Sequence, residues 1–275
     1  MVREAYLLAG ATATGKSAAA AILARELGAA ILSADSMLVY RDMDIGTAKP
    51  SPEERAEFDM GGVDLVTPAE DFSAGEWLRQ AGTWAAKLPP TRPLVVVGGT
   101  GLYFTALLRG LDAPWQQPPP EYPVLQMDRD ERRQRIGRRI DAMLSAGLEQ
   151  EVAHLRAVYP IWSRTAAAAI GYKEFGAPLR GTDEVESSFR PVSGRSVRDE
   201  IFYRTCQFAK RQDTWFRHQS TPLYVPCGAT AEETAAAVRA VWQAHGPWPI
   251  NFPAPDALEA SHFSSLCISG GRSVK

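Results

Sequence analysis

Residues 6–28 read YLLAGATATGKSAAAAILARELG, and this stretch decides the fold of the chain. The apolar run Tyr6–Ala9 is typical of a buried strand, and it stops at Gly10. Residues 16–27 are rich in Ala and Leu, which favour a helix, and Gly28 marks the helix end. The residues between strand and helix fit the pattern G-x-x-x-x-G-K-[ST], which predicts a phosphate-binding loop.

The predicted loop comprises Gly10, Ala11, Thr12, Ala13, Thr14, Gly15, Lys16 and Ser17. Its glycines let the backbone wrap around phosphate oxygens, and amide N–H groups at the helix start point at the anion. Lys16 brings a positive charge to the outer phosphates, and Ser17 is a candidate Mg²⁺ ligand. Such loops are typical of nucleotide-binding, often ATP-binding, proteins. The pattern indicates a diphosphate or triphosphate ligand without saying which. An apolar run ending in Asp, expected of an ordinary ATPase or kinase, is missing.

Further apolar runs alternate with helical patterns along the first 111 residues. Residues 30–32 and 94–97 are predicted strands, and residues 74–87 and 102–108 have the composition and spacing of helices. Strands that alternate with helices form parallel sheets. The sequence therefore predicts an α/β fold of the P-loop NTPase type, with a parallel sheet flanked by helices and a helical C-terminal part.

Four segments are expected along the chain. They are a P-loop catalytic core (1–111), a proline-rich linker (112–128), a basic helical part that completes the core (129–245) and a poorly ordered tail (246–275). Five prolines between residues 112 and 123 indicate a stiff connector rather than a helix or strand. In the basic part, helices are predicted over 129–157, with a break near Gly147, and from about residue 196 to 217.

Composition places the chain among ordinary globular proteins. It has 275 residues, of which 45% are hydrophobic and 23% charged, and this excludes a disordered or collagen-like chain. Three cysteines without a C-x-x-C spacing argue against both a disulfide framework and a zinc site. The chain has no apolar run long enough for a membrane span and begins without a signal-peptide pattern. A cytoplasmic location is therefore expected.

Charge is distributed unevenly. Residues 1–128 carry a net charge of −6, residues 129–217 of +5, and residues 218–275 of −1. A basic segment suits a polyanion, because each phosphate contact releases counterions. Interspersed Asp and Glu residues allow the alternative that this is a solvated, salt-bridged helix face.

Two polar side chains follow predicted strands near the phosphate loop. Asp35 comes after residues 30–32, where the ends of parallel strands face a ligand, and it is a candidate general base. A helix cap or an outer Mg²⁺ ligand are the alternatives for this carboxylate. Thr100 lies among the glycines of residues 98–101 and could hydrogen-bond a substrate or cap the next helix. Residues 40–50 are expected to form a loop over the site.

These features together resemble the tRNA dimethylallyltransferase family, also called tRNA isopentenyltransferases. The matching text is GATATGKS (10–17), SADSMLVYRDMDIGTAKP (33–50), GGTGLYFTALLRGL (98–111), RIGRRIDAMLSAGLEQEV (135–152), AIGYKEF (169–175) and RTCQFAKRQDTWFR (204–217). These segments run in the order of the family and cover most of residues 5–217.

The resemblance implies a set of roles. The phosphate loop, with Lys16 and Ser17, would hold the diphosphate of dimethylallyl diphosphate and its Mg²⁺. Asp35 would accept a proton from the N6 amine of the target adenosine, and Thr100 would orient the same amine. Arg139 falls where the family has an arginine on the diphosphate. The leaving diphosphate needs its charge neutralised, and the amine must be placed in line with the reacting carbon.

The resemblance also implies contacts with tRNA. The candidate tRNA-binding residues are Asp35, Ser36, Met37, Leu38, Thr100, Lys173, Lys210, Arg211 and Gln212. The expected partners are the anticodon loop of tRNA and dimethylallyl diphosphate, with no membrane, and the protein is expected to be a monomer. A base that reacts this way must leave its stack. Phe208, Trp215 and Phe216 could line the channel that receives it, or pack in the core.

The chain departs from the family between the GGTGLYF and RIGRR segments. Family members carry a large helical insertion there that grips the anticodon stem-loop, whereas residues 112–128 alone join the two segments here. The chain could be a minimal tRNA enzyme, a free-nucleotide enzyme like the adenylate isopentenyltransferases, or a deletion that has lost activity. A P-loop small-molecule kinase and a pure RNA-binding module are alternatives from other classes. The motif wording and the basic segment 129–217 favour tRNA.

Overall fold

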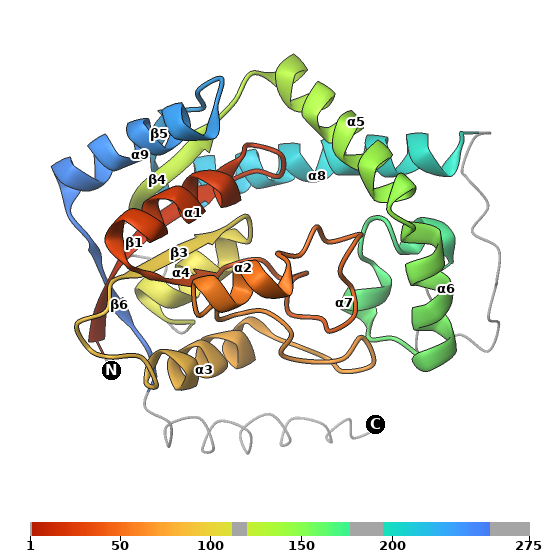
Figure 1. The fold of residues 1–275 in the computed structure, drawn as a ribbon, viewed down its shortest axis with the longest axis horizontal. Coiled ribbons are helices and arrows are strands. Elements are labelled where there is room, and N and C mark those ends of the chain that lie inside the picture. Colours follow the sequence, from red (N-terminus) through yellow and green to blue (C-terminus); the bar gives the residue numbers. More distant parts are fainter. Residues whose placement is uncertain (1, 112–119, 177–194, 254–275) are drawn as a thin grey trace, which may run out of the picture.

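A mostly parallel sheet forms the centre of the molecule. The computed structural model describes residues 2–111, 120–176 and 195–253. The strands in these ranges are β1 (Val2–Gly10), β2 (Ala30–Ser33), β3 (Leu94–Gly98), β4 (Glu121–Gln126), β5 (Thr221–Pro226) and β6 (Trp248–Asn251). Five of them run parallel in the order β2-β3-β1-β4-β5, and β6 pairs antiparallel with the start of β1 (Figure 1). The carboxyl ends of β1, β2 and β3 therefore meet at one edge.

Helices cover both faces of this sheet. The helical elements are α1 (Lys16–Leu27), α2 (Pro52–Glu57), α3 (Ala74–Ala85), α4 (Gly101–Arg109), α5 (Arg129–Ser145), α6 (Leu148–Val158), α7 (Arg164–Ala167), the 3₁₀ turn η1 (Lys173–Phe175), α8 (Val197–Gln219) and α9 (Ala231–His245). Successive side chains of a strand point to opposite faces. Leu8 accordingly packs in a core with α1 and α9, and Leu7 in a larger core with α3, α4 and α8. The predicted fold class is confirmed.

The helix boundaries follow local signals in the sequence. α1 begins after Gly15 and ends before Gly28, and both glycines adopt the left-handed conformation that a side chain disfavours. Ser73 and Ser196 cap α3 and α8 by accepting hydrogen bonds from backbone N–H groups in the first turn. The predicted break between α5 and α6 is confirmed, since Gly147 starts α6 with a φ of 99°.

Strand β4 contradicts the prediction that residues 112–123 form no element. Pro123 fits a strand because of the direction of its backbone. Pro120 O and Gln126 O accept hydrogen bonds from Thr221 N in β5 and from Cys227 N directly after it, so the backbone polar groups of even-numbered residues in β4 point to β5. Pro123 then faces β1, whose pairing with β4 begins only at Val124, so its missing N–H breaks no bond. Residues 112–119 lie outside the described residues.

The tail was also predicted wrongly at its start. Residues 248–251 form β6, which pairs with Val2–Ala5 at the start of β1. Residues 254–275 lie outside the described part of the chain, so their predicted disorder stays a prediction, as do the four segment boundaries.

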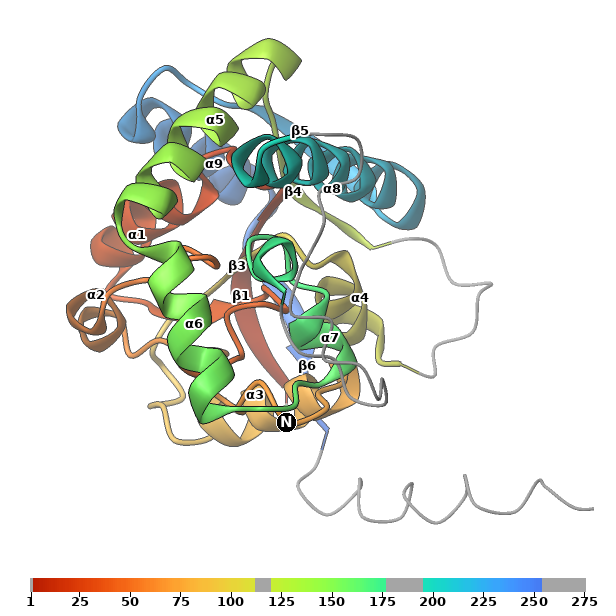
Figure 2. The ribbon, with the colours of Figure 1, turned by 90° about the vertical axis from the view of Figure 1, so that its right-hand side faces the viewer.

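Helices α5, α6 and α7 stand beside the carboxyl edge of the sheet, as Figure 2 shows from that side. Ile136 and Ile140 of α5 and Leu148 and Val152 of α6 are buried and belong to the larger core. These helices therefore bring residues from the basic middle third of the chain next to the phosphate loop. None of the helices in the described residues has the length and apolarity to cross a bilayer.

Candidate active site

The phosphate loop joins β1 to α1, as predicted. Ala13 and Gly15 both have positive φ, of 67° and 83°, which curls the loop back on itself. The Thr14 hydroxyl donates to Ala11 O at 2.9 Å, and Lys16 Nζ donates to the same oxygen at 3.3 Å. A helix start with this geometry directs backbone N–H groups and a lysine toward one point, which suits a bound phosphate.

Lys16 lies between charges of both signs. Burial lowers the pKa of its ammonium group, the charge of Asp35 opposes this and the charge of Arg139 adds to it, and together they bring the pKa from 10.5 to about 8. Burial also lowers the pKa of Arg139, again against the attraction of Asp35. Lys16 and Arg139 line the same cavity and Asp35 acts on both, so two cations beside one carboxylate favour binding of an anionic ligand.

Asp35 and Ser36 form a tight turn after β2. Asp35 Oδ1 accepts a hydrogen bond from Met37 N at 2.9 Å, which leaves its second oxygen available to a ligand. The Thr100 hydroxyl accepts from Ser36 N at 2.9 Å and lies 3.2 Å from the Ser36 hydroxyl. Thr100 thus fixes this turn from the end of β3, and its direct contact with a substrate stays a prediction.

The glycines after β3 accommodate other parts of the protein. A side chain on Gly98 would overlap with the Ala34 backbone, and one on Gly101 would overlap with the ring of Trp215. One on Gly99 would overlap with the side chain of Gln212. The close approach expected at these glycines therefore serves neighbouring chain segments.

Gln212, a residue of α8, links the chain segments that follow β1 and β3. Its Oε1 accepts from Thr12 N at 2.9 Å, and its Nε2 donates to Gly99 O at 2.9 Å. The side chain is buried, so these two bonds satisfy both ends of its amide. Gln212 was predicted to contact tRNA, and that contact remains a prediction. In the structure, Gln212 also bridges the phosphate loop and the turn after β3 through these two hydrogen bonds.

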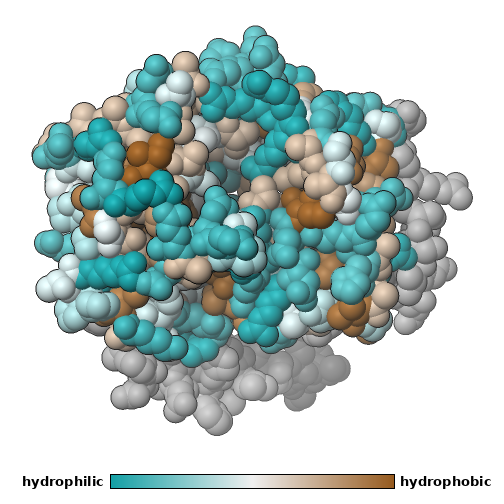
Figure 3. All heavy atoms as spheres, viewed as in Figure 1, coloured by the Kyte–Doolittle hydropathy of each residue, from teal (hydrophilic) through white to brown (hydrophobic). Residues whose placement is uncertain are grey.

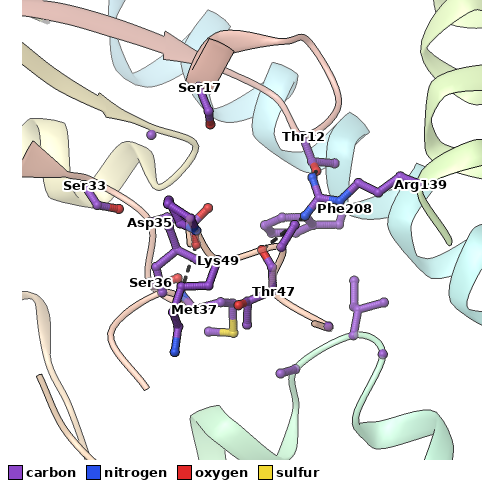
Figure 4. Close-up of a pocket in the computed structure, with 18 of the residues that line it drawn as sticks. Thr12, Ser17, Ser33, Asp35, Ser36, Met37, Thr47, Lys49, Arg139 and Phe208 are labelled. Atoms are coloured by element: carbon purple, nitrogen blue, oxygen red, sulfur yellow. Dashed lines mark hydrogen bonds between the residues drawn. The ribbon is translucent and has the colours of Figure 1, made fainter. Parts of the chain in front are cut away.

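Arg139 reaches the phosphate loop from α5. Its Nη1 donates to Thr12 Oγ1 at 3.4 Å and its Nη2 to Thr47 O at 3.2 Å. Figure 4 shows this guanidinium and Asp35 on opposite sides of a shared space. Other arginines of the basic segment are paired with carboxylates, as Arg132 is with Asp213 at 2.7 Å. The segment thus combines a salt-bridged helix face with cations that remain directed at the site.

Residues 40–50 form a loop over the site, as predicted. No role was predicted for Lys49, but its side chain is almost fully buried in this loop. Lys49 Nζ lies 2.5 Å from Asp44 Oδ1 and 2.7 Å from Asp64 Oδ1, and it donates to Tyr40 O at 2.7 Å. These contacts stabilise the loop from within.

A cavity of about 750 Å³ connects these groups. The face in Figure 3 is mainly hydrophilic, with hydrophobic residues scattered over it. The predicted site residues that line the cavity are Thr12, Lys16, Ser17, Asp35, Ser36, Met37, Leu38, Arg139, Arg211 and Gln212. One wall is aliphatic and aromatic, and it consists of Ile136, Ile140, Met143, Ile201 and Phe208. Of the three aromatic candidates, Phe208 alone is in this lining, whereas Phe216 is buried in the core.

Lys173 and Lys210, two of the predicted tRNA-binding residues, do not line this cavity. Lys173 lines a second, smaller hollow beside α8, together with Arg195, Arg204 and Arg211. Arg211 lines both spaces, so the two are adjacent. Lys210 is exposed and lines neither. The positive charge near the cavity mouth therefore continues along one side of α8.

Fold and site define a P-loop α/β protein whose phosphate loop opens into a partly apolar cavity. The model of the family described as IPP transferase matches residues 38–124 and 116–219, and that of Isopentenyl transferase matches residues 3–59. The chain belongs to the IPP transferase family.

Individual relatives agree with this assignment. A tRNA dimethylallyltransferase of Synechococcus sp. is 33% identical over 291 residues, covering 81% of this chain and 82% of that protein. One of Bdellovibrio bacteriovorus is 30% identical over 78% of this chain and 90% of its own length. Among solved structures, the tRNA isopentenylpyrophosphate transferase of Bacillus halodurans has the same fold, with a TM-score of 0.71 at 23% identity over 88% of this chain and 96% of that one.

The family match falls into two parts that meet at residues 116–124. This junction lies in the predicted linker, between α4 and α5. The absence of the family's helical insertion at this position stays a prediction.

Proposed function

We propose that this protein transfers a dimethylallyl group from dimethylallyl diphosphate to N6 of the adenosine next to the anticodon in tRNA, and releases diphosphate. The observation that carries the proposal is one cavity that joins a phosphate loop, two cations, a carboxylate and an apolar wall. It is supported by relatives named tRNA dimethylallyltransferase and by a structural neighbour described as a eukaryotic dimethylallyltransferase acting on tRNA.

The leaving group determines what the phosphate loop must do. As the carbon–oxygen bond breaks, electrons move to the diphosphate and the allylic carbon becomes cation-like. Lys16 and Arg139 stand where they would stabilise the growing negative charge, and burial, which lowers the pKa of both, makes their charges act more strongly on a bound anion. The aliphatic residues of α5 and α8 would receive the dimethylallyl group and shield the cationic carbon from water.

The acceptor side depends on Asp35. An adenine amine is a weak nucleophile, and it acquires a positive charge as its nitrogen bonds to the allylic carbon. The Asp35 carboxylate would orient this amine by accepting its N–H and would then take the proton. Thr100 would keep the turn of Asp35 and Ser36 in place through its bond from Ser36 N.

Mg²⁺ fits this site as an ion bound jointly by the protein and by the phosphates of the substrate. Within residues 2–111, 120–176 and 195–253, His, Cys, Asp and Glu form no group of three that could hold a metal. Mg²⁺ commonly keeps several waters and binds one or two protein oxygens plus substrate phosphates. Ser17, at the start of α1 and in the cavity lining, would provide such an oxygen. When bound, the ion would neutralise part of the diphosphate charge.

The tRNA would approach along α8. Lys173, Arg195 and Arg211 supply positive charge beside the cavity, which suits the phosphates that flank the target base. Phe208 in the cavity wall offers a ring on which an unstacked adenine could rest. The proposed acceptor is therefore a single-stranded loop with one base turned out of its stack.

A paired transfer assay tests this proposal. The purified protein is given Mg²⁺ and labelled dimethylallyl diphosphate, with either unmodified tRNA or free AMP as acceptor. The proposal predicts label on tRNA. Label on AMP alone would identify a free-nucleotide enzyme, and label on neither by a folded protein would refute transfer. Phosphate transfer from ATP to a small molecule would indicate a kinase.

A further inference from the structure

A carboxylate on α6 holds the loop that covers the cavity. Glu151 Oε2 accepts hydrogen bonds from Asp44 N at 3.1 Å and Ile45 N at 2.7 Å, and Glu151 Oε1 accepts from Gly46 N at 3.2 Å. Three consecutive N–H groups thus converge on one side chain more than 100 residues away in the chain. Backbone nests of this kind bind anions. Here the anion is a carboxylate of the protein, so these amides are not free for a phosphate.

Tyr172 completes this cluster. Its hydroxyl donates to Glu151 Oε1 at 2.6 Å, which makes four hydrogen bonds on the carboxylate. Burial, and then the charge of Glu151, raise the pKa of Tyr172, which keeps the hydroxyl protonated as a donor. A side chain on Gly46 would overlap with the ring of Tyr172, so ring and loop are in close contact.

The loop needs such external support. Asp42 and Ala48 both adopt the left-handed conformation, with φ of 66° and 51°, although neither is a glycine. Such residues are strained and persist when the surrounding structure holds them. Glu151 binds the backbone midway between them, and Tyr159 donates to Asp42 Oδ2 at 2.8 Å. The conformation of the loop is thus set in part from α6.

The same loop holds Arg139. Thr47 O accepts from Arg139 Nη2, directly after the three residues that Glu151 binds. We propose that Glu151 is a positioning residue for diphosphate binding. It fixes the loop so that the Thr47 carbonyl holds the Arg139 guanidinium against Thr12 of the phosphate loop. This inference rests on the proposed function, because it assumes that Arg139 binds the diphosphate of the substrate.

Glu151→Gln is the variant that tests this role. The amide keeps the size of the side chain but offers one acceptor oxygen and turns an NH₂ group toward N–H donors. We expect inorganic diphosphate with Mg²⁺ to bind about tenfold more weakly by calorimetry, and kcat/KM for dimethylallyl diphosphate to fall by at least as much, because Arg139 also stabilises the charge that grows on the leaving group. Glu149→Gln is the matched control, because Glu149 is exposed on the same helix, and it should bind diphosphate like the wild type.

A double variant shows whether Glu151 acts through Arg139. If it does, Glu151→Gln should weaken diphosphate binding far less in an Arg139→Ala background than in the wild type, since the group that it positions is gone. Independent action would make the two losses multiply, and that result would overturn the proposal. Tyr172→Phe removes one of the four bonds and should weaken binding about two- to threefold at a small cost in stability, which covers the case that Glu151→Gln unfolds.

The outcomes separate this inference from the proposed function. If the wild type binds diphosphate and Glu151→Gln or Tyr172→Phe, folded, binds it equally well, the role of Glu151 is refuted and the proposed function stands. If the folded wild type binds neither diphosphate nor dimethylallyl diphosphate, the proposed function fails and this inference fails with it.

Discussion

Replacing Lys16 by methionine should stabilise the fold while it destroys the phosphate site. In the folded protein the ammonium group is desolvated, which disfavours its charged form. The drop in the pKa of Lys16 from 10.5 to about 8 corresponds to at most about 3.5 kcal/mol, at about 1.4 kcal/mol per pKa unit. Lys16 keeps some solvent exposure, and screening reduces the expected gain for Lys16→Met at pH 7 to about 1–2 kcal/mol.

The stability gained by Lys16→Met should decrease as the pH rises. Below pH 8 Lys16 is charged in both the folded and the unfolded chain, and the penalty is fully present. Between pH 8 and 10.5 the unfolded chain binds more protons, so the wild type gains stability as pH rises. The stability difference between variant and wild type should therefore shrink over this window.

Denaturant unfolding of both proteins at pH 7 and at pH 10.5 measures this difference, and other titrating groups cancel in the comparison. At pH 7 the variant should also melt about 2–8 °C higher and should no longer bind diphosphate. A variant that is less stable than the wild type at pH 7, or a stability difference that stays constant up to pH 10.5, would refute the reasoning. Stabilisation at the expense of function is common where a site is built from desolvated charges.

Three further predictions concern the catalytic groups, the support from α8 and the RNA. Asp35→Asn should lower kcat by about 10²–10⁴-fold with an unchanged melting temperature. Thr100→Ala should lower prenyl transfer, because it removes the hydroxyl that holds Ser36. Full activity of either variant in single-turnover assays would contradict the role of that residue. Gln212→Ala leaves Thr12 N and a buried carbonyl unsatisfied, so it should cost about 1–3 kcal/mol in denaturant unfolding; an unchanged unfolding midpoint would contradict this. Since residues 112–128 are predicted to replace the family's helical insertion, tRNA binding should be weak and should fall steeply with salt in filter-binding assays; a flat salt dependence would exclude a phosphate-driven interface.

Strong local signals made the phosphate-loop half predictable. The strand, loop and first helix agree with the sequence to within a few residues, because Gly10, Gly15 and Gly28 mark the turns and an alanine-rich run has few alternatives to a helix. Strand β4 was missed because proline usually excludes a central strand. Only the register with β1 shows that the missing N–H of Pro123 breaks no hydrogen bond, and pairing between segments more than 100 residues apart leaves no trace in local composition.

The residues of the candidate site were also predicted only in part. Lys16, Asp35 and Arg139 were predicted and converge on one cavity. Glu151 was missed because it reads as one of several charges on a surface helix. A partial signal exists, since Leu148, Val152 and Leu155 are the buried residues of α6 and Glu151 stands next to Val152. Three of its four hydrogen-bond donors, however, are backbone N–H groups, and these carry no sequence pattern.

The most direct test of the central claim is to locate the transferred group. Unmodified tRNA is incubated with the protein, Mg²⁺ and dimethylallyl diphosphate, digested to nucleosides and to short fragments, and analysed by mass spectrometry. We predict N6-dimethylallyl-adenosine at the position next to the anticodon, and its loss with Asp35→Asn. A group on another base or position, or a product that Asp35→Asn forms equally well, would contradict it.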